Sequence, residues 1–170
     1  LRPSKGGGAW MNSVRSQSTF DGNQLPIVFN VCNFPPKNKE GVSLLSFEQV
    51  ETLFHEFGHG LHGLLSQATY PSLSGTRVTR DYVEFPSQMM ENWAREPEVI
   101  KSFAKHYKTG EAIPDELLNK IAAAGKFNAG FETTEYVAAA LLDMAWHTSE
   151  TDIEDVNNFE DTSLEALGLI

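Results

Sequence analysis

The segment His55-Glu56-Phe57-Gly58-His59 combines two imidazoles and one carboxylate at a fixed spacing. In a helix, His55 and His59 lie one turn apart on the same face, so both rings can reach one metal ion at about 2.0–2.1 Å from each nitrogen. Glu56 projects beside such an ion and can take a proton from a water molecule instead of binding the metal. The pattern therefore predicts a site for one Zn²⁺ per chain with an adjacent general base.

A catalytic zinc site takes three protein ligands and leaves one position open. His62 follows His59 by three residues, but one helix does not easily place three histidines around a tetrahedral ion. We therefore expect His62 to pack or hydrogen-bond near the site. The acids of the next expected helix are Asp81, Glu84 and Glu91. Glu84 lies 25 residues after His59, which is long enough for a loop and an antiparallel return, but spacing alone leaves the third ligand undecided.

Three further side chains are candidates to support the ligands. Glu51 lies one turn before His55 and could accept a hydrogen bond from a ligand histidine, as carboxylates around metal sites do. Gln88 and Glu91 on the following helix are rival candidates. For each of the three, a solvated helical side chain is an equally good interpretation.

The elements that must position these residues are mostly helices. Ser46 and Gln49 form a capping-box pattern at a helix start, and an apolar stripe at helical spacing follows to about Gln67. The stripe consists of Val50, Phe54, Phe57, Leu61, Leu64 and Leu65. Further helices are expected over residues 81–94 with Pro86 in the first turns, over 97–108, from Pro114, and over 131–147.

The first forty residues read as strands and loops, with β-type patterns over residues 10–18 and 25–34 that stop at Pro35-Pro36. The sequence thus predicts a mainly α fold with a small N-terminal β element. We interpret residues 1–170 as one partial catalytic domain, with strands and loops over 1–40 and helices over 46–170.

Composition excludes several classes of function. The 170 residues carry 13 Lys and Arg against 23 Asp and Glu, a net charge of −10, so a basic surface for nucleic acid is not expected. Residues 131–170 carry ten acids and no Lys or Arg, which is typical of a solvated surface. No apolar run approaches the roughly 18 residues that a membrane span needs. The single cysteine, Cys32, excludes an internal disulfide.

Two motifs resemble the zinc site of the thimet oligopeptidase family of metallopeptidases. They are His55-Glu-Phe-Gly-His-Gly-Leu-His62 and the segment from Thr79 to Trp93, which contains Asp-Tyr-Val-Glu84-Phe-Pro. Segments 8–18 and 30–34 are similar to the family too, and segments 127–136 and 143–147 are closest to its peptidyl-dipeptidase branch. The resemblance covers essentially the whole chain. It implies that His55, His59 and Glu84 bind zinc, that Glu56 is the general base, and that short peptides are the substrates.

The resemblance also sets expectations about what is missing. Members of this family are several times longer, and a downstream segment rich in Gly, His and Tyr helps to stabilise the transition state. No such segment is present here, so we expect a metal-binding core that is inactive or nearly so by itself. An endo-acting oligopeptidase of the same family and a noncatalytic metal- or peptide-binding module are the alternatives to the release of C-terminal dipeptides. A cytoplasmic location is expected, with the periplasm as the alternative; the sequence predicts no oligomeric state.

Overall fold

The structure, a computed structural model, describes residues 6–169. These residues form two compact units that divide between residues 113 and 114, and each unit is described by itself. The first unit holds the two strands and three α-helices, and the second holds three more α-helices. The predicted fold class, mainly α with a small N-terminal β element, is confirmed over the described residues.

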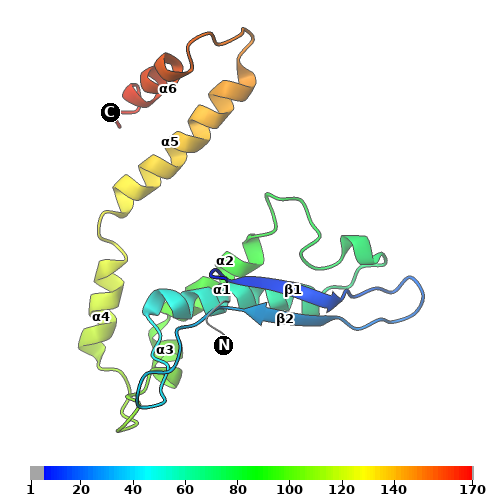
Figure 1. The fold of residues 1–170 in the computed structure, drawn as a ribbon, viewed down its shortest axis with the longest axis vertical. Coiled ribbons are helices and arrows are strands. Elements are labelled where there is room, and N and C mark those ends of the chain that lie inside the picture. The colour runs from blue at the N-terminus through cyan, green and yellow to red at the C-terminus, as the bar shows by residue number, and fades with distance from the viewer. Residues whose placement is uncertain (1–5, 170) are drawn as a thin grey trace. The chain divides into compact units, whose positions relative to one another are not determined.

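The β element is a two-stranded hairpin (Figure 1). β1 (Trp10–Arg15) and β2 (Ile27–Val31) are antiparallel, and Trp10 lies opposite Val31. Both strands are shorter than the patterns over 10–18 and 25–34 predicted. After β2 the chain reaches Asn33, whose φ of 50° breaks the extended conformation before the two prolines.

The long helix α1 (Phe47–Leu64) carries the predicted metal motif and packs against the hairpin and α2. Its predicted capping box is confirmed, because Ser46 Oγ accepts from the Gln49 backbone N–H at 3.3 Å and Gln49 Oε1 accepts from the Ser46 N–H at 3.0 Å. These two bonds satisfy helix donors that have no partner within the first turn. The start of α1 is therefore fixed locally.

Helix α2 (Phe85–Arg95) begins four residues later than the pattern from residue 81 predicted. Pro86 lies in its first turn, where a missing N–H costs no helix bond, whereas a longer helix would put this proline in the interior. Residues 79–85 instead form consecutive turns, with Tyr82 N–H donating to Thr79 O and Phe85 N–H to Tyr82 O. Between α1 and α2 the loop also contains a short 3₁₀ helix, η1 (Pro71–Leu73).

Helix α3 (Pro97–Phe103) starts at the predicted proline but ends five residues before the predicted end at residue 108. The chain turns back there, and Lys105 pairs with Ala112 as an isolated antiparallel bridge. Gly110 provides the left-handed backbone conformation of this turn, with a φ of 75°. The bridge uses the backbone groups that a longer helix would have needed.

The second unit contains α4 (Asp115–Ala124), α5 (Ala129–Thr148) and α6 (Val156–Glu165). The sequence predicted α4 and α5 but not α6 as an element of its own. Trp146 of α5 and Phe159 of α6 are in ring contact, with centroids 4.5 Å apart. No helix in the described part of the chain has the length and apolar character needed to span a membrane. The cytoplasmic or periplasmic location stays a prediction.

Candidate metal centre

The two motif histidines lie on the face of α1 that meets α2. Their rings are 4.9 Å apart between centroids and nearly perpendicular, at 87°. His59 is buried, with 9% of its surface exposed, and His55 is half-buried. One helical turn therefore places both imidazoles beside one point, as the helical period requires.

Glu84 brings the third candidate ligand atom to that point. Its Oε2 lies 3.2 Å from His55 Nε2 and 3.0 Å from His59 Nε2. Ligand atoms at about 2.0–2.1 Å from a tetrahedral zinc ion are separated from one another by about 3.3 Å. Two imidazole nitrogens and one carboxylate oxygen are also a donor set that zinc takes in catalytic sites. The side chains present thus fit a zinc ion in both spacing and chemistry.

Glu84 is the N-cap residue of α2, directly before Phe85 and Pro86. Ser87 Oγ lies 2.8 Å from Glu84 Oε2 and donates to it, so one turn of α2 orients the carboxylate. Burial raises the pKa of Glu84, but the Ser87 hydrogen bond and the charges of His59 and His55 outweigh this effect and lower the pKa below its usual value. The carboxylate is therefore ionised at neutral pH, the form that binds metal.

One carboxylate oxygen of Glu56 is buried without a hydrogen-bond partner in the described part of the chain. The side chain is 5% exposed, and Oε2 makes no hydrogen bond to the described residues. It lines an open cavity of about 390 Å³ together with His55, His59 and Glu84. Buried carboxylate oxygens in proteins normally have a hydrogen-bond partner. Oε2 of Glu56 is therefore an unpaired buried acceptor in a residue that lines the cavity.

The same cavity is walled by two further segments. Residues 9–11, at the start of β1, form one side, and Thr76 and Val83 of the loop between α1 and α2 form another. The sequence motifs include residues 9–11 and Val83, but no role was predicted for them or for Thr76. The contact between a strand and a loop far apart in sequence brings them together.

Among the three candidate supporting residues, the structure brings Glu91 to a histidine. Its Oε1 lies 2.6 Å from His55 Nδ1, the ring nitrogen that faces away from Glu84. Glu51, which was expected one turn before His55, instead forms an ion pair with Arg95 Nη2 at 2.6 Å. Gln88 is exposed on α2, and its backbone N–H donates to Glu84 O at 2.9 Å.

His62 lies outside the cluster of candidate ligand atoms, which within the described residues comprises His55, His59 and Glu84. Its ring makes an edge contact with Tyr82, with centroids 6.1 Å apart. Burial lowers the pKa of His62, and the neighbouring His59 lowers it further. The ring therefore packs against Tyr82, outside the three candidate donors, and a supporting role for His62 stays a prediction.

Glycines of α1 permit the close packing on which the site depends. A Cβ atom at Gly58 would lie 2.6 Å from both Pro86 O and Ser87 Cα, and one at Gly63 would lie 2.8 Å from Met11 Cε. Glycine inside a helix costs about 1 kcal/mol relative to alanine. The repeated glycines between residues 58 and 63 indicate that other segments pack closely against this helix. The sequence-based predictions did not use this signal.

Comparison with known proteins agrees with this geometry. The sequence profile described as Peptidase family M3 matches residues 1–167. The chain is 48% identical to the dipeptidyl carboxypeptidase of Escherichia coli over 167 residues, which cover 97% of this chain and 24% of that protein. It is 42% identical to the organellar oligopeptidase A of Arabidopsis thaliana over 86% of this chain and 20% of the relative. It is 41% identical to oligopeptidase A of E. coli over 86% of this chain and 22% of the relative. The chain thus spans about a quarter of the length of the curated relatives that it matches.

Proposed function

This chain belongs to peptidase family M3, and we propose that it carries the zinc centre of a longer enzyme that hydrolyses short peptides. One observation carries the proposal. The Oε2 atom of Glu84 lies within 3.2 Å of the Nε2 atoms of both motif histidines. Glu56 lines the same cavity, and its Oε2 has no hydrogen-bond partner among the described residues. This arrangement has the donors and the base that metal-assisted peptide hydrolysis requires.

His55, His59 and Glu84 would hold the ion. When bound, zinc supplies a Lewis acid that polarises the scissile carbonyl and lowers the pKa of water. Glu91 would keep the proton of His55 on Nδ1 and so leave the lone pair of Nε2 for the metal. The ion pair between Glu51 and Arg95 supports the contact between α1 and α2 that keeps these donors together.

Glu56 would act as the general base. Its carboxylate takes one proton from the water molecule that attacks the peptide carbonyl, and it later gives that proton to the leaving amine, so the enzyme returns to its starting protonation state. The low exposure of Glu56, its place in the lining of the cavity and its unpaired Oε2 support this role. A noncatalytic binding module would have no use for such a base.

The peptide would lie along the hairpin. The first residues of β1 line the cavity. Since a strand edge offers N–H and C=O groups to an extended peptide, we assign the backbone contact to β1. Residues 9–11 then lie along the peptide on one side of the scissile bond.

We propose that the longer enzyme releases C-terminal dipeptides, because the relative with 48% identity is named a dipeptidyl carboxypeptidase. Endo-acting cleavage is the second candidate, supported by the identities of 42% and 41% to proteins named oligopeptidase A. The 170-residue chain alone is expected to have little turnover, because a metal and a base without oxyanion donors forfeit several kcal/mol of barrier reduction.

Zinc stoichiometry tests the centre directly. The chain is dialysed against dilute zinc and analysed for metal, beside the variants His55→Ala and Glu84→Ala. One zinc per chain that is lost in both variants is the expected result. His147→Ala is the matched control, because His147 is an exposed histidine whose Nδ1 contacts Asp143 O in the second unit. A folded chain without stoichiometric zinc, or variants that keep it, would contradict the assigned centre.

A further inference from the structure

A cluster of buried polar side chains joins the end of the hairpin to the loop between α1 and α2. Gln17 and Ser74 are each 5% exposed. The Ala68 N–H donates to Gln17 Oε1 at 2.8 Å, and Ser74 Oγ lies 3.5 Å from the same oxygen. On the other side of the cluster, Ser66 Oγ accepts from the Gly75 N–H at 3.1 Å and lies 3.2 Å from Ser74 Oγ.

This cluster connects two walls of the cavity to each other. Gln17 follows β1, whose first residues line the cavity, and Gly75 directly precedes Thr76, which lines it from the loop. Gly75 is itself pressed against α1, since a Cβ atom there would lie 3.0 Å from Gly63 Cα. The position of Thr76 relative to β1 therefore depends on the hydrogen bonds of Gln17 and Ser66.

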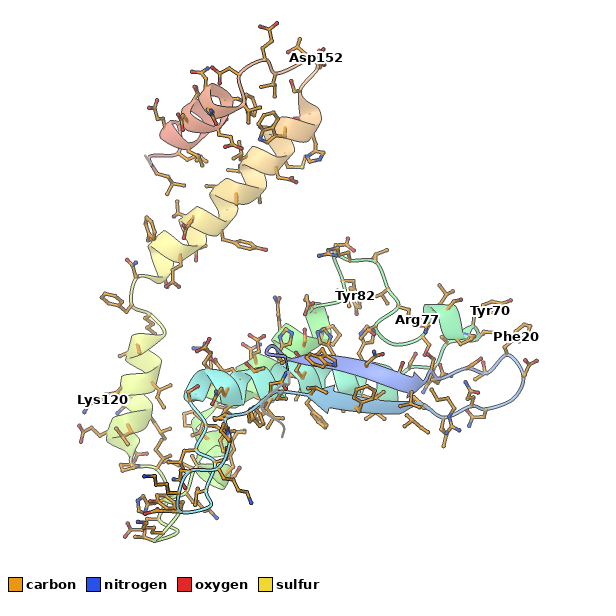
Figure 2. The ribbon with its side chains drawn as sticks, viewed as in Figure 1. Phe20, Tyr70, Arg77, Tyr82, Lys120 and Asp152 are labelled. Atoms are coloured by element: carbon orange, nitrogen blue, oxygen red, sulfur yellow. The ribbon has the colours of Figure 1, made fainter. Side chains whose placement is uncertain are left out.

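Other contacts attach the hairpin to the same loop without using Gln17. Ser18 Oγ donates to Thr69 O at 2.9 Å, and the Thr19 N–H donates to Ala68 O at 3.2 Å. The rings of Phe20 and Tyr70 are in contact, with centroids 5.4 Å apart, and Figure 2 shows these two side chains together at the hairpin tip. Loss of the Gln17 oxygen would shift the loop near Thr76 but leave the hairpin attached.

The metal donors are held by different contacts. His55 and His59 lie on α1, and Glu84 begins α2, which meets α1 at Gly58. None of these contacts passes through Gln17 or Ser66. A change in the polar cluster should therefore alter the cavity wall and leave the three donors in place.

We propose that Gln17 is a positioning residue for peptide binding, whose buried side-chain oxygen sets the separation between β1 and Thr76 across the cavity. The inference rests on the proposed function, because it takes the occupant of the cavity to be an extended peptide. A buried hydrogen bond is suited to this role, because an unpaired Ala68 N–H destabilises the folded chain far more than the loss of a solvent-exposed contact does.

The test measures zinc and peptide binding in the same chain. Tetra-alanine is titrated calorimetrically into the zinc-loaded chain carrying Glu56→Gln, which prevents cleavage, with and without Gln17→Leu. We expect Gln17→Leu to weaken tetra-alanine binding about tenfold while the chain keeps one zinc. Gln17→Glu, which retains an oxygen acceptor for the Ala68 N–H, should restore binding. Gln24→Leu is the matched control, because Gln24 is exposed on the same hairpin and donates to Ser16 O.

A second variant covers the case in which Gln17→Leu does not fold. Ser66→Ala removes the acceptor of the Gly75 N–H from the opposite side of the cluster, and it should weaken tetra-alanine binding with zinc retained. If these variants bind tetra-alanine as tightly as the parent, the role of Gln17 is wrong and the proposed function stands. If the zinc-loaded parent does not bind the peptide, the peptide function of the cavity is wrong, and the inference is overturned with it.

Discussion

His55 Nδ1 lies 2.6 Å from Oε1 of Glu91, on the side of the imidazole ring that faces away from Glu84. A carboxylate at this distance holds the ring proton on Nδ1, so Nε2 carries the free lone pair. The same histidine thus joins two residues of α2, Glu91 through one nitrogen and Glu84 through the other. In the proposed zinc centre, this contact leaves Nε2 of His55 for the metal.

Removal of the Glu91 carboxylate should weaken zinc binding. We expect Glu91→Ala to raise the zinc dissociation constant by about 10–100-fold, because the ring of His55 loses the group that fixes its tautomer and orientation. Competition with a chromophoric chelator measures the change. Glu48→Ala is the control, since Glu48 is an exposed carboxylate in the first turn of α1. Equal zinc affinity in Glu91→Ala and the unchanged chain would contradict the role of Glu91.

Replacement of the base should separate metal binding from turnover. In the longer enzyme, Glu56→Gln should keep one zinc per chain and lower kcat for a short peptide by about 10³-fold, because the amide cannot take a proton from water. Glu48→Gln on the exposed first turn of the same helix should leave kcat unchanged. Retained turnover by Glu56→Gln with bound metal would refute the assignment.

A methyl group between α1 and α2 should destabilise the first unit. At Gly58 the added Cβ meets backbone atoms of Pro86 and Ser87 at 2.6 Å, so we expect Gly58→Ala to lower the free energy of unfolding by about 2 kcal/mol. A Cβ atom added at Gly130 in α5 has no neighbouring atom within 4 Å. Gly130→Ala should therefore raise the free energy of unfolding by up to about 1 kcal/mol, because alanine has the higher helix propensity. Denaturant unfolding compares the two variants; similar changes in both would contradict the close contact.

The stability contributed by Glu40 should depend on pH in a defined direction. Hydrogen bonds from Tyr107 Oη at 2.7 Å and Lys108 Nζ at 3.2 Å lower the pKa of Glu40 below its ordinary value of 4.5. Because Glu40 has a lower pKa in the folded chain than in the unfolded chain, its full contribution to the free energy of unfolding is present above the unfolded-state pKa. That contribution is lost as the pH falls through the folded-state pKa. Thermal unfolding should therefore show a lower Tm for Glu40→Gln than for the unchanged chain near pH 7.

The Tm values of Glu40→Gln and the unchanged chain should become similar at acidic pH. Once the pH has fallen below the lowered folded-state pKa, Glu40 is protonated in both folded and unfolded chains, and the difference in Tm should shrink. Glu48→Gln serves as the control for loss of an exposed carboxylate. A difference in Tm that grows on acidification would show that the sign is wrong.

The sequence by itself determined the local features of this protein. The helical period places His55 and His59 on one face, the Ser46–Gln49 capping box starts α1, and Pro97 starts α3. Each of these depends on groups within about one helical turn, which is why spacing and residue type were sufficient.

Tertiary structure decided which residues lie together at the candidate site. Spacing left Asp81, Glu84 and Glu91 open as the third donor, and the packing of α2 on α1 brings Glu84 to the Nε2 atoms and Glu91 to Nδ1 of His55. It also directs Glu51 to Arg95 and makes the start of β1 one wall of the cavity. These choices depend on contacts between segments far apart in sequence. The distance between such segments is set by side-chain volumes at the interface, above all by the missing side chain at Gly58, and no local pattern encodes it.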